Sequence, residues 1–416
     1  MKTILRWKAR LRWRPLSFFL LGCAMLAPVA LAQDSIFNIQ TSPSPSRAGN
    51  TLNAVTAISA EDAWAVGYKN SNNLNEARTL ILHWDGAAWN AISSPNPGRC
   101  KQGNYGNVLN AVSAISATDV WAVGFTFGCD AQLQPLAMHW NGQNWKVVMT
   151  PVLPFDNNAL NGVQAWAPDN VYAVGYQTAS NGATQTLVEH WDGTNWTIVD
   201  SPNKNNTGNI LFATSGSSPS DMWAVGAATA PNVPIKTLIL HFDGVTWKLV
   251  KSPNPIGSGD LSQNVLVAVQ ALSSKNAIAV GFILDSNNQR ELTMIQHWNG
   301  TKWKVVSSPN VDERGGSFNT LKGVTVLSST NLYAVGFFAN AGTAGQQETL
   351  VEHFDGSAWT IVDSPTKGLA QQLNGVFGLA GTSEVWSVGA WARNGTDPED
   401  GFLIIPRSLV LFSPIG

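Results

Sequence analysis

One sequence unit recurs seven times along the chain, and this periodicity limits the possible fold more than any other feature. Each copy begins with a leucine preceded by a polar amide, and the copies are 51 to 57 residues apart, at Leu52, Leu109, Leu160, Leu211, Leu266, Leu321 and Leu373. A Val-Gly pair follows in every copy. Six copies then have His, an aromatic residue, Asp or Asn, and Gly, with a tryptophan three residues after that glycine. Periods of this length are typical of propellers and solenoids.

Within the first copy we expect four short strands, at 52–59, 63–68, 79–84 and 89–95. Asp85-Gly86 separates the last two, and Asp-Gly pairs support tight turns between antiparallel strands. The strands are apolar on both faces, which indicates that each small sheet is sandwiched between others. Four antiparallel strands per repeat, buried on both faces, predict an all-β protein with a β-propeller fold.

The two ends of the chain indicate how the array closes. The last copy supplies three strands, ending at 408–413, and no fourth follows. Residues 37–43 match the fourth-strand pattern, with an aromatic residue six positions before a proline. We therefore expect this N-terminal strand to join the last three strands, because closure removes the exposed edges of an open array. The prediction is a single seven-bladed propeller domain over residues 33–416.

Residues 1–32 have the pattern of a signal peptide. Six Lys or Arg residues precede an apolar run at 16–31, and ALA at 30–32 forms a small-x-small cleavage motif. Removing these six of the 25 basic residues, and none of the 27 acidic ones, leaves 19 Lys+Arg and a net charge of −8. We expect a secreted or periplasmic protein cleaved near Ala32. The alternative is a lipoprotein anchored through Cys23, although the apolar run continues past that cysteine.

The composition argues against nucleic acid or a bilayer as the partner. Charged residues make up 12% of the chain, about half of the usual share. The predicted mature chain is acidic, so no basic surface for phosphates is expected. No apolar stretch after residue 32 is long enough to span a bilayer.

All six histidines occupy one repeat position, before the aromatic-Asx-Gly turn: His83, His139, His190, His241, His297 and His353. In a sevenfold ring, histidines at this third-strand position of neighbouring repeats would be roughly 14 Å apart. Zn–N bonds are only about 2 Å long, so these histidines could not share a metal ion. A catalytic site needs one differentiated constellation, which six equivalent copies do not provide. We therefore predict a structural role, with each imidazole hydrogen bonded to the following hairpin or to a nearby backbone carbonyl. No metal or other cofactor is expected.

The connections between second and third strands, and those between successive repeats, are long and variable. Both should emerge on one face of a propeller, where binding residues are then expected. Two loop cysteines, Cys100 and Cys129, are predicted to form a disulfide, since disulfides persist in exported proteins. The loop aromatic residues predicted to contact a ligand are Tyr105, Phe127, Phe155, Phe318 and Trp391.

A second candidate site is the mouth of the channel expected along the propeller axis. Amides recur just inside the first strand, at Asn53, Asn110, Asn161 and Asn374, with Lys322 at the same position of another copy. These amides could hydrogen-bond sugar hydroxyls, or they could cap the strands and hold water. Both interpretations remain open from the sequence.

Loop carboxylates are the residues that an enzyme would use. The acids expected on the variable face are Glu76, Asp130, Asp156, Asp260, Asp285, Glu291, Asp312, Glu313, Glu348, Asp397, Glu399 and Asp400. A glycosidase needs two carboxyl groups at a defined separation, and the sequence does not place two loops relative to each other.

The WAVG…HWDG…W repeat resembles the tandem propeller repeats of secreted bacterial proteins, over residues 36–416. It is similar to kelch and galactose-oxidase-like propellers, although it lacks the double glycine of kelch repeats, since Tyr68 follows Gly67. The DGAAW hairpins look like a relative of the Asp-box turn of sialidases, without the spacer between Asp and Gly. The copper ligands of galactose oxidase and the arginine set of sialidases have no recognisable counterpart, so the resemblance implies a fold and a binding role rather than a reaction.

From the repeat, the loops and this resemblance we expect a secreted, monomeric, non-catalytic propeller. It would recognise a glycan or an extracellular protein through the variable loop face. The alternative is a carbohydrate-active enzyme, a glycosidase or lyase, that uses loop carboxylates.

Overall fold

All regular structure in the described part of the chain is β-strand. The computed structural model describes residues 36–71, 76–98, 105–128, 132–151, 153, 155, 157–231, 233–256, 262–342, 346–395 and 403–414. These segments contain 28 strands and no helix, which confirms the all-β prediction. Within these segments, therefore, nothing forms a helix of the length and hydropathy needed to cross a membrane.

The sequence repeats supply the strands in order. Repeats 1 to 3 form β2 (Asn50–Ser59), β3 (Asp62–Asn70), β4 (Glu76–Trp84), β5 (Trp89–Ile92), β6 (Tyr105–Ser116), β7 (Asp119–Phe127), β8 (Leu133–Trp140), β9 (Trp145–Val148), β10 (Ala159–Ala167), β11 (Asn170–Thr178), β12 (Thr184–Trp191) and β13 (Trp196–Ile198). Repeats 4 to 6 form β14 (Gly208–Ser218), β15 (Asp221–Ala230), β16 (Val233–Phe242), β17 (Trp247–Leu249), β18 (Gln263–Ser273), β19 (Asn276–Asp285), β20 (Arg290–Trp298), β21 (Trp303–Val306), β22 (Phe318–Ser328), β23 (Asn331–Ala339), β24 (Glu348–Phe354) and β25 (Trp359–Ile361). Repeat 7 forms β26 (Ala370–Gly378), β27 (Glu384–Gly395) and β28 (Leu403–Pro414), and β1 (Asn38–Gln40) precedes repeat 1.

The four strands of each of the first six repeats pair antiparallel in sequence order, as β2-β3-β4-β5 does. Repeat 7 has the sheet order β26-β27-β28-β1. The pairing of β1 with β28 is antiparallel, with Asn38 opposite Phe412 and Gln40 opposite Val410. The N-terminal strand therefore lies where the fourth strand of repeat 7 would be.

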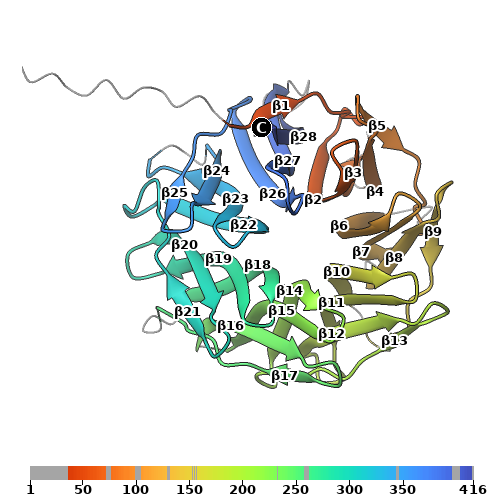
Figure 1. Ribbon diagram of the computed structural model, residues 1–416, viewed down its shortest axis with the longest axis horizontal. Helices are drawn as coiled ribbons and strands as arrows, with labels where there is room; N and C mark the ends of the chain where they lie inside the picture. The colour runs from red at the N-terminus through yellow and green to blue at the C-terminus, as the bar shows by residue number, and fades with distance from the viewer. Residues whose placement is uncertain are drawn as a thin grey trace, which may run out of the picture. The chain divides into compact units, whose positions relative to one another are not determined.

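The first strand of each repeat lies innermost and the fourth lies outermost around a central space (Figure 1). Each first strand contacts the first strand of the next repeat, and β26 of repeat 7 contacts β2 of repeat 1. The turns between first and second strands meet the hairpins between third and fourth strands, since the Trp84 indole Nε1 donates to Ala60 O at 2.9 Å. We call this side the hairpin face, and the opposite side, with the long connections, the loop face.

The repeated Val-Gly pair marks a close approach of two strands. The register of β2 against β3 shifts between Leu52 and Ala54, next to Gly67. A Cβ atom at Gly67 would lie 2.0 Å from Thr51 O, so no side chain fits there. The equivalent clash is 1.8 to 2.0 Å at Gly124, Gly175, Gly226, Gly281, Gly336 and Gly389.

Apolar side chains of adjacent repeats form the core. Trp64 and Val66 of β3, for example, pack with Leu109 of β6 and Ala122 of β7. Residues 63–67 of β3 are buried without interruption. The continuous apolar runs in the sequence therefore reflect strands covered on both faces.

Candidate functional site

Each histidine bonds to the Asp or Asn that opens the second strand of its own repeat. Nε2 to Oδ1 distances are 2.6 to 3.0 Å in the pairs His83–Asp62, His139–Asp119, His190–Asn170, His241–Asp221, His297–Asn276 and His353–Asn331. The partner is thus an Asx side chain, and not the hairpin or backbone carbonyl expected from the sequence. Because Asp and Asn alternate at this position, it requires an acceptor oxygen rather than a charge.

The amides two residues before each repeat leucine hold the loops that link successive repeats. Asn107 Nδ2 donates to Gly98 O at 3.0 Å, and its Oδ1 accepts from Gly98 N at 2.9 Å. Asn50 makes the same pair of bonds with Ser46. In repeat 7 this role passes to Gln371, which accepts from Lys367 N. These loop-face connections are therefore tied to the rigid inner strands.

The predicted channel amides join neighbouring first strands. Asn53 Nδ2 donates to Leu109 O at 2.8 Å, and the other three bonds, at 2.8 to 2.9 Å, are Asn110 to Leu160 O, Asn161 to Leu211 O and Asn374 to Leu52 O. The last bond links repeat 7 to repeat 1. The Oδ1 atoms of Asn53 and Asn110 accept no hydrogen bond from a described residue, so they remain available to a ligand.

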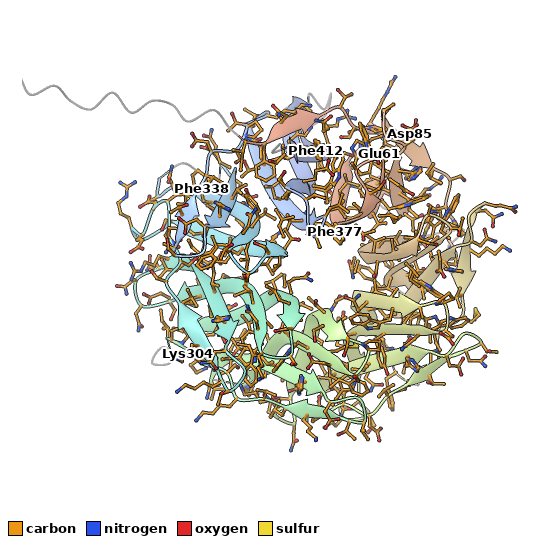
Figure 2. All side chains as sticks on the ribbon, viewed as in Figure 1. Glu61, Asp85, Lys304, Phe338, Phe377 and Phe412 are labelled. Atoms are coloured by element: carbon orange, nitrogen blue, oxygen red, sulfur yellow. The ribbon has the colours of Figure 1, made fainter. Side chains whose placement is uncertain are left out.

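A cavity of about 520 Å³, which we call the channel, lies between the first strands. Its lining includes the four amides, with Lys322, Phe212 and Val267 at the equivalent position of other repeats. Trp166 and Phe377 also line it, and Figure 2 shows Phe377 at the inner edge of the strands. Lys322 is the one charged side chain among the described residues of this lining. The described lining of the channel therefore combines apolar strand residues with amides, aromatic rings and a single charge.

Lys322 has neutral hydrogen-bond acceptors and a carboxyl group near it. Its Nζ lies 3.1 Å from Asn374 Oδ1 and 3.3 Å from Gln372 Oε1, and 5.3 Å from the centre of the Phe337 ring. Burial lowers the pKa of Lys322, and the charge of Glu291 acts in the opposite direction. An ammonium group that has lost water in this way is stabilised when an anion binds beside it.

Glu291, at the start of β20, is close enough to Lys322 for its charge to act on that lysine. The Thr320 hydroxyl donates to Glu291 Oε1. Burial raises the pKa of Glu291, against the effects of the Thr320 hydrogen bond and the Lys322 charge. From the sequence, Glu291 is one loop acid among many, because its contact with the first strand of the next repeat is visible only in the structure.

Other described loop acids are held in local bonds. Glu76 bonds Arg78 at 3.0 Å, and the Tyr105 hydroxyl, the Arg78 guanidinium and the Ser71 hydroxyl lower its pKa. Asn288 and Arg290 lower the pKa of Asp285, and Arg314 that of Asp312. Outside the described residues lie Asp130, Asp156, Asp260, Asp397, Glu399 and Asp400.

The five predicted loop aromatics differ in exposure. Phe155 and Phe318 are exposed, at 39% and 45%. Tyr105 and Phe127 are half-buried; Tyr105 bonds Glu76 and Arg78, and the Phe127 ring stacks with Phe125 at 6.5 Å. Trp391 is also half-buried, with Lys367 Nζ 4.9 Å from its ring centre. Among the five, only Phe155 and Phe318 are exposed. Cys100 and Cys129 lie outside the described residues.

Two buried carboxyl groups were missed from the sequence. Glu189 of β12 and Glu352 of β24 are both 0% exposed. Ser308 Oγ donates to Glu352 Oε2 at 3.0 Å, whereas both carboxyl oxygens of Glu189 lack a hydrogen-bond partner among the described residues. Burial raises the pKa of each to about 8. The sequence signal for these buried carboxyl groups is the glutamate of TLVEH in repeats 3 and 6, at a position where TLILH of repeat 1 has a leucine.

Comparisons with known proteins identify the fold. No protein-family profile matches the chain, and no curated protein matches it in sequence. A solved structure of YCF48 bound to D1 peptide is similar, with a TM-score of 0.52 and 12% identity, over 92% of this chain and 97% of that chain. YjhT is 12% identical over 76% of this chain and 99% of that chain, with a TM-score of 0.43.

A third solved structure is an ulvan lyase of the polysaccharide lyase family PL25, bound to -[GlcA(1-4)Rha3S]-. It has a TM-score of 0.54 and 8% identity, over 86% of this chain and 94% of that chain. Likeness at such low identity shows the fold alone. The chain has a β-propeller-like, all-β fold.

Proposed function

We propose that the protein is an exported, seven-bladed propeller that binds carbohydrate carrying an acidic group at the loop-face mouth of its channel. Each repeat would be one blade, with β1 completing the last. The contact of β26 with β2 and the bond from Asn374 to Leu52 O support this closure. The basic and apolar segment at 1–32 supports export.

One observation carries the choice of ligand: Lys322 is the single charged side chain among the described residues that line the channel. Glu291 is not among the described lining residues, so a uronate or sulfate group would supply, within the channel, the counter-charge that the amide neighbours of Lys322 do not. The free amide oxygens of Asn53 and Asn110 would accept hydrogen bonds from sugar hydroxyls. Phe212, which stands at the amide position of repeat 4 and also lines the channel, would offer an aromatic face to the apolar side of a sugar ring.

The size of the channel agrees with such a ligand. About 520 Å³ lies within the range of roughly 300–1,000 Å³ that is usual for small-molecule sites. Among the similar solved structures, the ulvan lyase is bound to a repeat that contains GlcA and Rha3S, and YCF48 is bound to a peptide. The proposal for this chain depends on Lys322 and the amides, and not on those ligands.

An array of neutral, uronate-containing and sulfated oligosaccharides would test the proposal, with each spot analysed by mass spectrometry after exposure to the protein. We expect retention of unchanged acidic oligosaccharides and weaker retention of neutral ones. If no oligosaccharide on the array were retained or changed, the carbohydrate assignment would be overturned and protein partners would be tested next. Equal retention of neutral and acidic sugars would overturn the role of Lys322.

A matched pair of variants would locate the site. Lys322→Gln removes the charge in the channel, whereas Lys304→Gln removes a charge on β21, at the outer edge of the molecule (Figure 2). We expect the first variant to lose about tenfold or more in affinity for an acidic oligosaccharide, equivalent to about 1.4 kcal/mol. The second should bind as the wild type does.

The second candidate function is a carbohydrate-active enzyme that uses Glu291. The observation in its favour is a carboxyl group whose pKa is raised by burial, close to a lysine at the channel. Raised carboxyl pKa values are common in general acids. A change in sugar mass on the array that disappears in Glu291→Gln would establish this function in place of simple binding.

Export and the disulfide are separate parts of the proposal. N-terminal sequencing of the protein recovered outside the cytoplasm should begin near Gln33, and a lipid on Cys23 would contradict this. Peptide maps with and without reductant should show Cys100 joined to Cys129. Two free thiols would contradict the proposed disulfide.

A further inference from the structure

Aromatic side chains fill the junctions between most repeats on the hairpin face. At the junction of repeats 4 and 5, the Trp223 ring lies 4.2 Å from His241 of its own repeat. The same indole lies 4.9 Å from Trp298 and 5.1 Å from Trp303 of the next repeat, edge-to-face with the latter at 89°. Trp64, Trp121 and Trp386 occupy the equivalent places at three other junctions and are 1% exposed.

Where tyrosine replaces this tryptophan, an aromatic ring still covers the histidine. The ring centres are 4.4 Å apart for Tyr172 and His190, and 4.5 Å apart for Tyr333 and His353. In both cases the phenol ring takes the place of the indole. The histidine is therefore covered by a ring at both of these junctions.

The junction of repeats 5 and 6 departs from this pattern. Ile278 of β19 occupies the second-strand position, and Phe354 of β24 replaces the tryptophan found at the equivalent place in repeat 5. His297 keeps its bond to Asn276 at 3.0 Å, but no described aromatic residue stacks on it. This junction therefore lacks the indole of the second strand, and it has a smaller phenyl ring in place of the indole of the third strand.

A cavity of about 220 Å³ occupies this junction. Its walls are mainly apolar: Leu272, Ile278, Val306, Leu332, Phe354 and Trp359. His297 and Asn276 supply one polar wall, and the exposed Ser329 and Gly356 lie at its rim on the hairpin face. An engineered apolar cavity of roughly 150 Å³ in another protein stays dry and binds benzene. The cavity is therefore large enough for an aromatic ring.

We propose that this cavity is a binding site for a small aromatic molecule of the size of indole. The bound ring would take the place that an indole or a phenol ring of the chain fills at the other junctions, stacked on His297 and edge-on to Trp359. Aromatic pairs prefer such stacked and edge-to-face arrangements, and their burial is favourable in an apolar site. The site is on the hairpin face, and it is independent of the carbohydrate site in the channel.

Titration of the whole protein with indole, by calorimetry or ligand-observed NMR, would test the proposal. We expect one saturable site with a dissociation constant of about 1 mM or lower. Ile278→Trp should fill the cavity and weaken indole binding about tenfold or more, while Lys322→Gln should leave it unchanged. No saturable binding by the wild type, or equal binding by the folded Ile278→Trp variant, would overturn the proposal.

A second variant covers the case in which the larger indole prevents folding. Ile278→Phe adds a ring with less volume, and it should still weaken indole binding and raise the melting temperature. Transfer of magnetisation from indole to the Trp359 ring provides a direct readout in the wild type. Contacts to channel residues instead of Trp359 would also overturn the assignment.

Discussion

The hairpin face and the channel mouth are both built from repeated polar residues, but they use those residues differently. On the hairpin face, each histidine bonds the Asx residue that opens its second strand, as His83 bonds Asp62. The Asx residue of the turn bonds the backbone of that turn; Asp85 Oδ1, for example, accepts from Ala87 N and Ala88 N. At the channel mouth, the amide nitrogens bond the next repeat, while the Asn53 and Asn110 oxygens accept no hydrogen bond from any described residue. Repeated polar groups whose hydrogen bonds are satisfied within the protein stabilise the fold. Those with an acceptor atom that lacks a protein partner can bind a ligand.

The largest effect is expected where an aromatic side chain seals a junction on the hairpin face. Trp223 is 1% exposed, and Trp223→Ala should lower the free energy of unfolding by about 3–5 kcal/mol, as buried Trp→Ala changes do. Urea denaturation followed by circular dichroism would measure this. Lys304→Ala, on the outer strand, is the control and should change stability by less than about 0.5 kcal/mol. Similar losses in the two variants would contradict the assigned core.

A second prediction concerns the buried carboxyl group of Glu352. Its pKa in the folded protein is raised from 4.5 to about 8, so between these values the folded state holds a proton that the unfolded chain has released. The free energy of unfolding should therefore fall as pH rises from 4.5 to 8. Glu352→Gln should remove the part of this fall that is due to Glu352, while Glu189, whose pKa is raised in the same way, keeps its own part. The substitution should stabilise the protein at pH 9 by roughly 5 kcal/mol.

The third strand of repeat 5 offers the matched control for that prediction. Gln296 stands where repeat 6 has Glu352, and it is also 0% exposed. Gln296→Glu should introduce a new loss of stability as pH rises, measured by thermal unfolding between pH 4.5 and 9. If the melting temperatures of the wild type and both variants changed with pH in parallel, burial would not raise the pKa of these carboxyl groups and the prediction would be wrong.

A smaller effect is expected at the Asx partner of a histidine. Asp119 Oδ1 lies 2.8 Å from His139 Nε2, and Asp119→Ala should cost about 1–3 kcal/mol because the imidazole loses a partly buried partner. Asp119→Asn reproduces the Asn170–His190 pair of repeat 3 and should cost less than about 0.5 kcal/mol. Denaturant melts of the two variants would separate the need for an acceptor from a need for charge. Equal losses would favour charge.

Local features of the chain were predictable because they depend on neighbouring residues. The Asp85-Gly86 hairpin needs an Asx side chain and a glycine at positive φ, here 88°, and both requirements are visible in the sequence. The Val-Gly pair and the fourth-strand pattern at 37–43 are recognised by their spacing alone. These signals were sufficient for the strand order and the all-β class.

Contacts between distant segments were not predictable in this way. The histidine partner lies 20 to 22 residues away in the sequence, and choosing it over a backbone carbonyl requires the register of two strands. Lys322 meets Glu291 from the preceding repeat and Gln372 from the following one. Such groups come together only through packing between repeats, so they cannot be singled out from the sequence.

A small gain in stability is expected for Lys322→Asn, which restores the repeated amide at the channel mouth. The new Nδ2 should donate to Leu373 O, as Asn53 does to Leu109 O, and raise the free energy of unfolding by about 0.5–1.5 kcal/mol. Urea denaturation measures this change. A loss of more than about 1 kcal/mol would show that Lys322 is needed for the fold.

The measurement that tests the account most directly is isothermal titration calorimetry of an acidic oligosaccharide into the wild type and the Lys322→Asn variant. We predict a saturable isotherm for the wild type and at least about a tenfold weaker one for the folded variant. That result would place ligand recognition at the position where the channel departs from its repeat. Equal affinities in the two proteins would contradict the account and move the binding site away from Lys322.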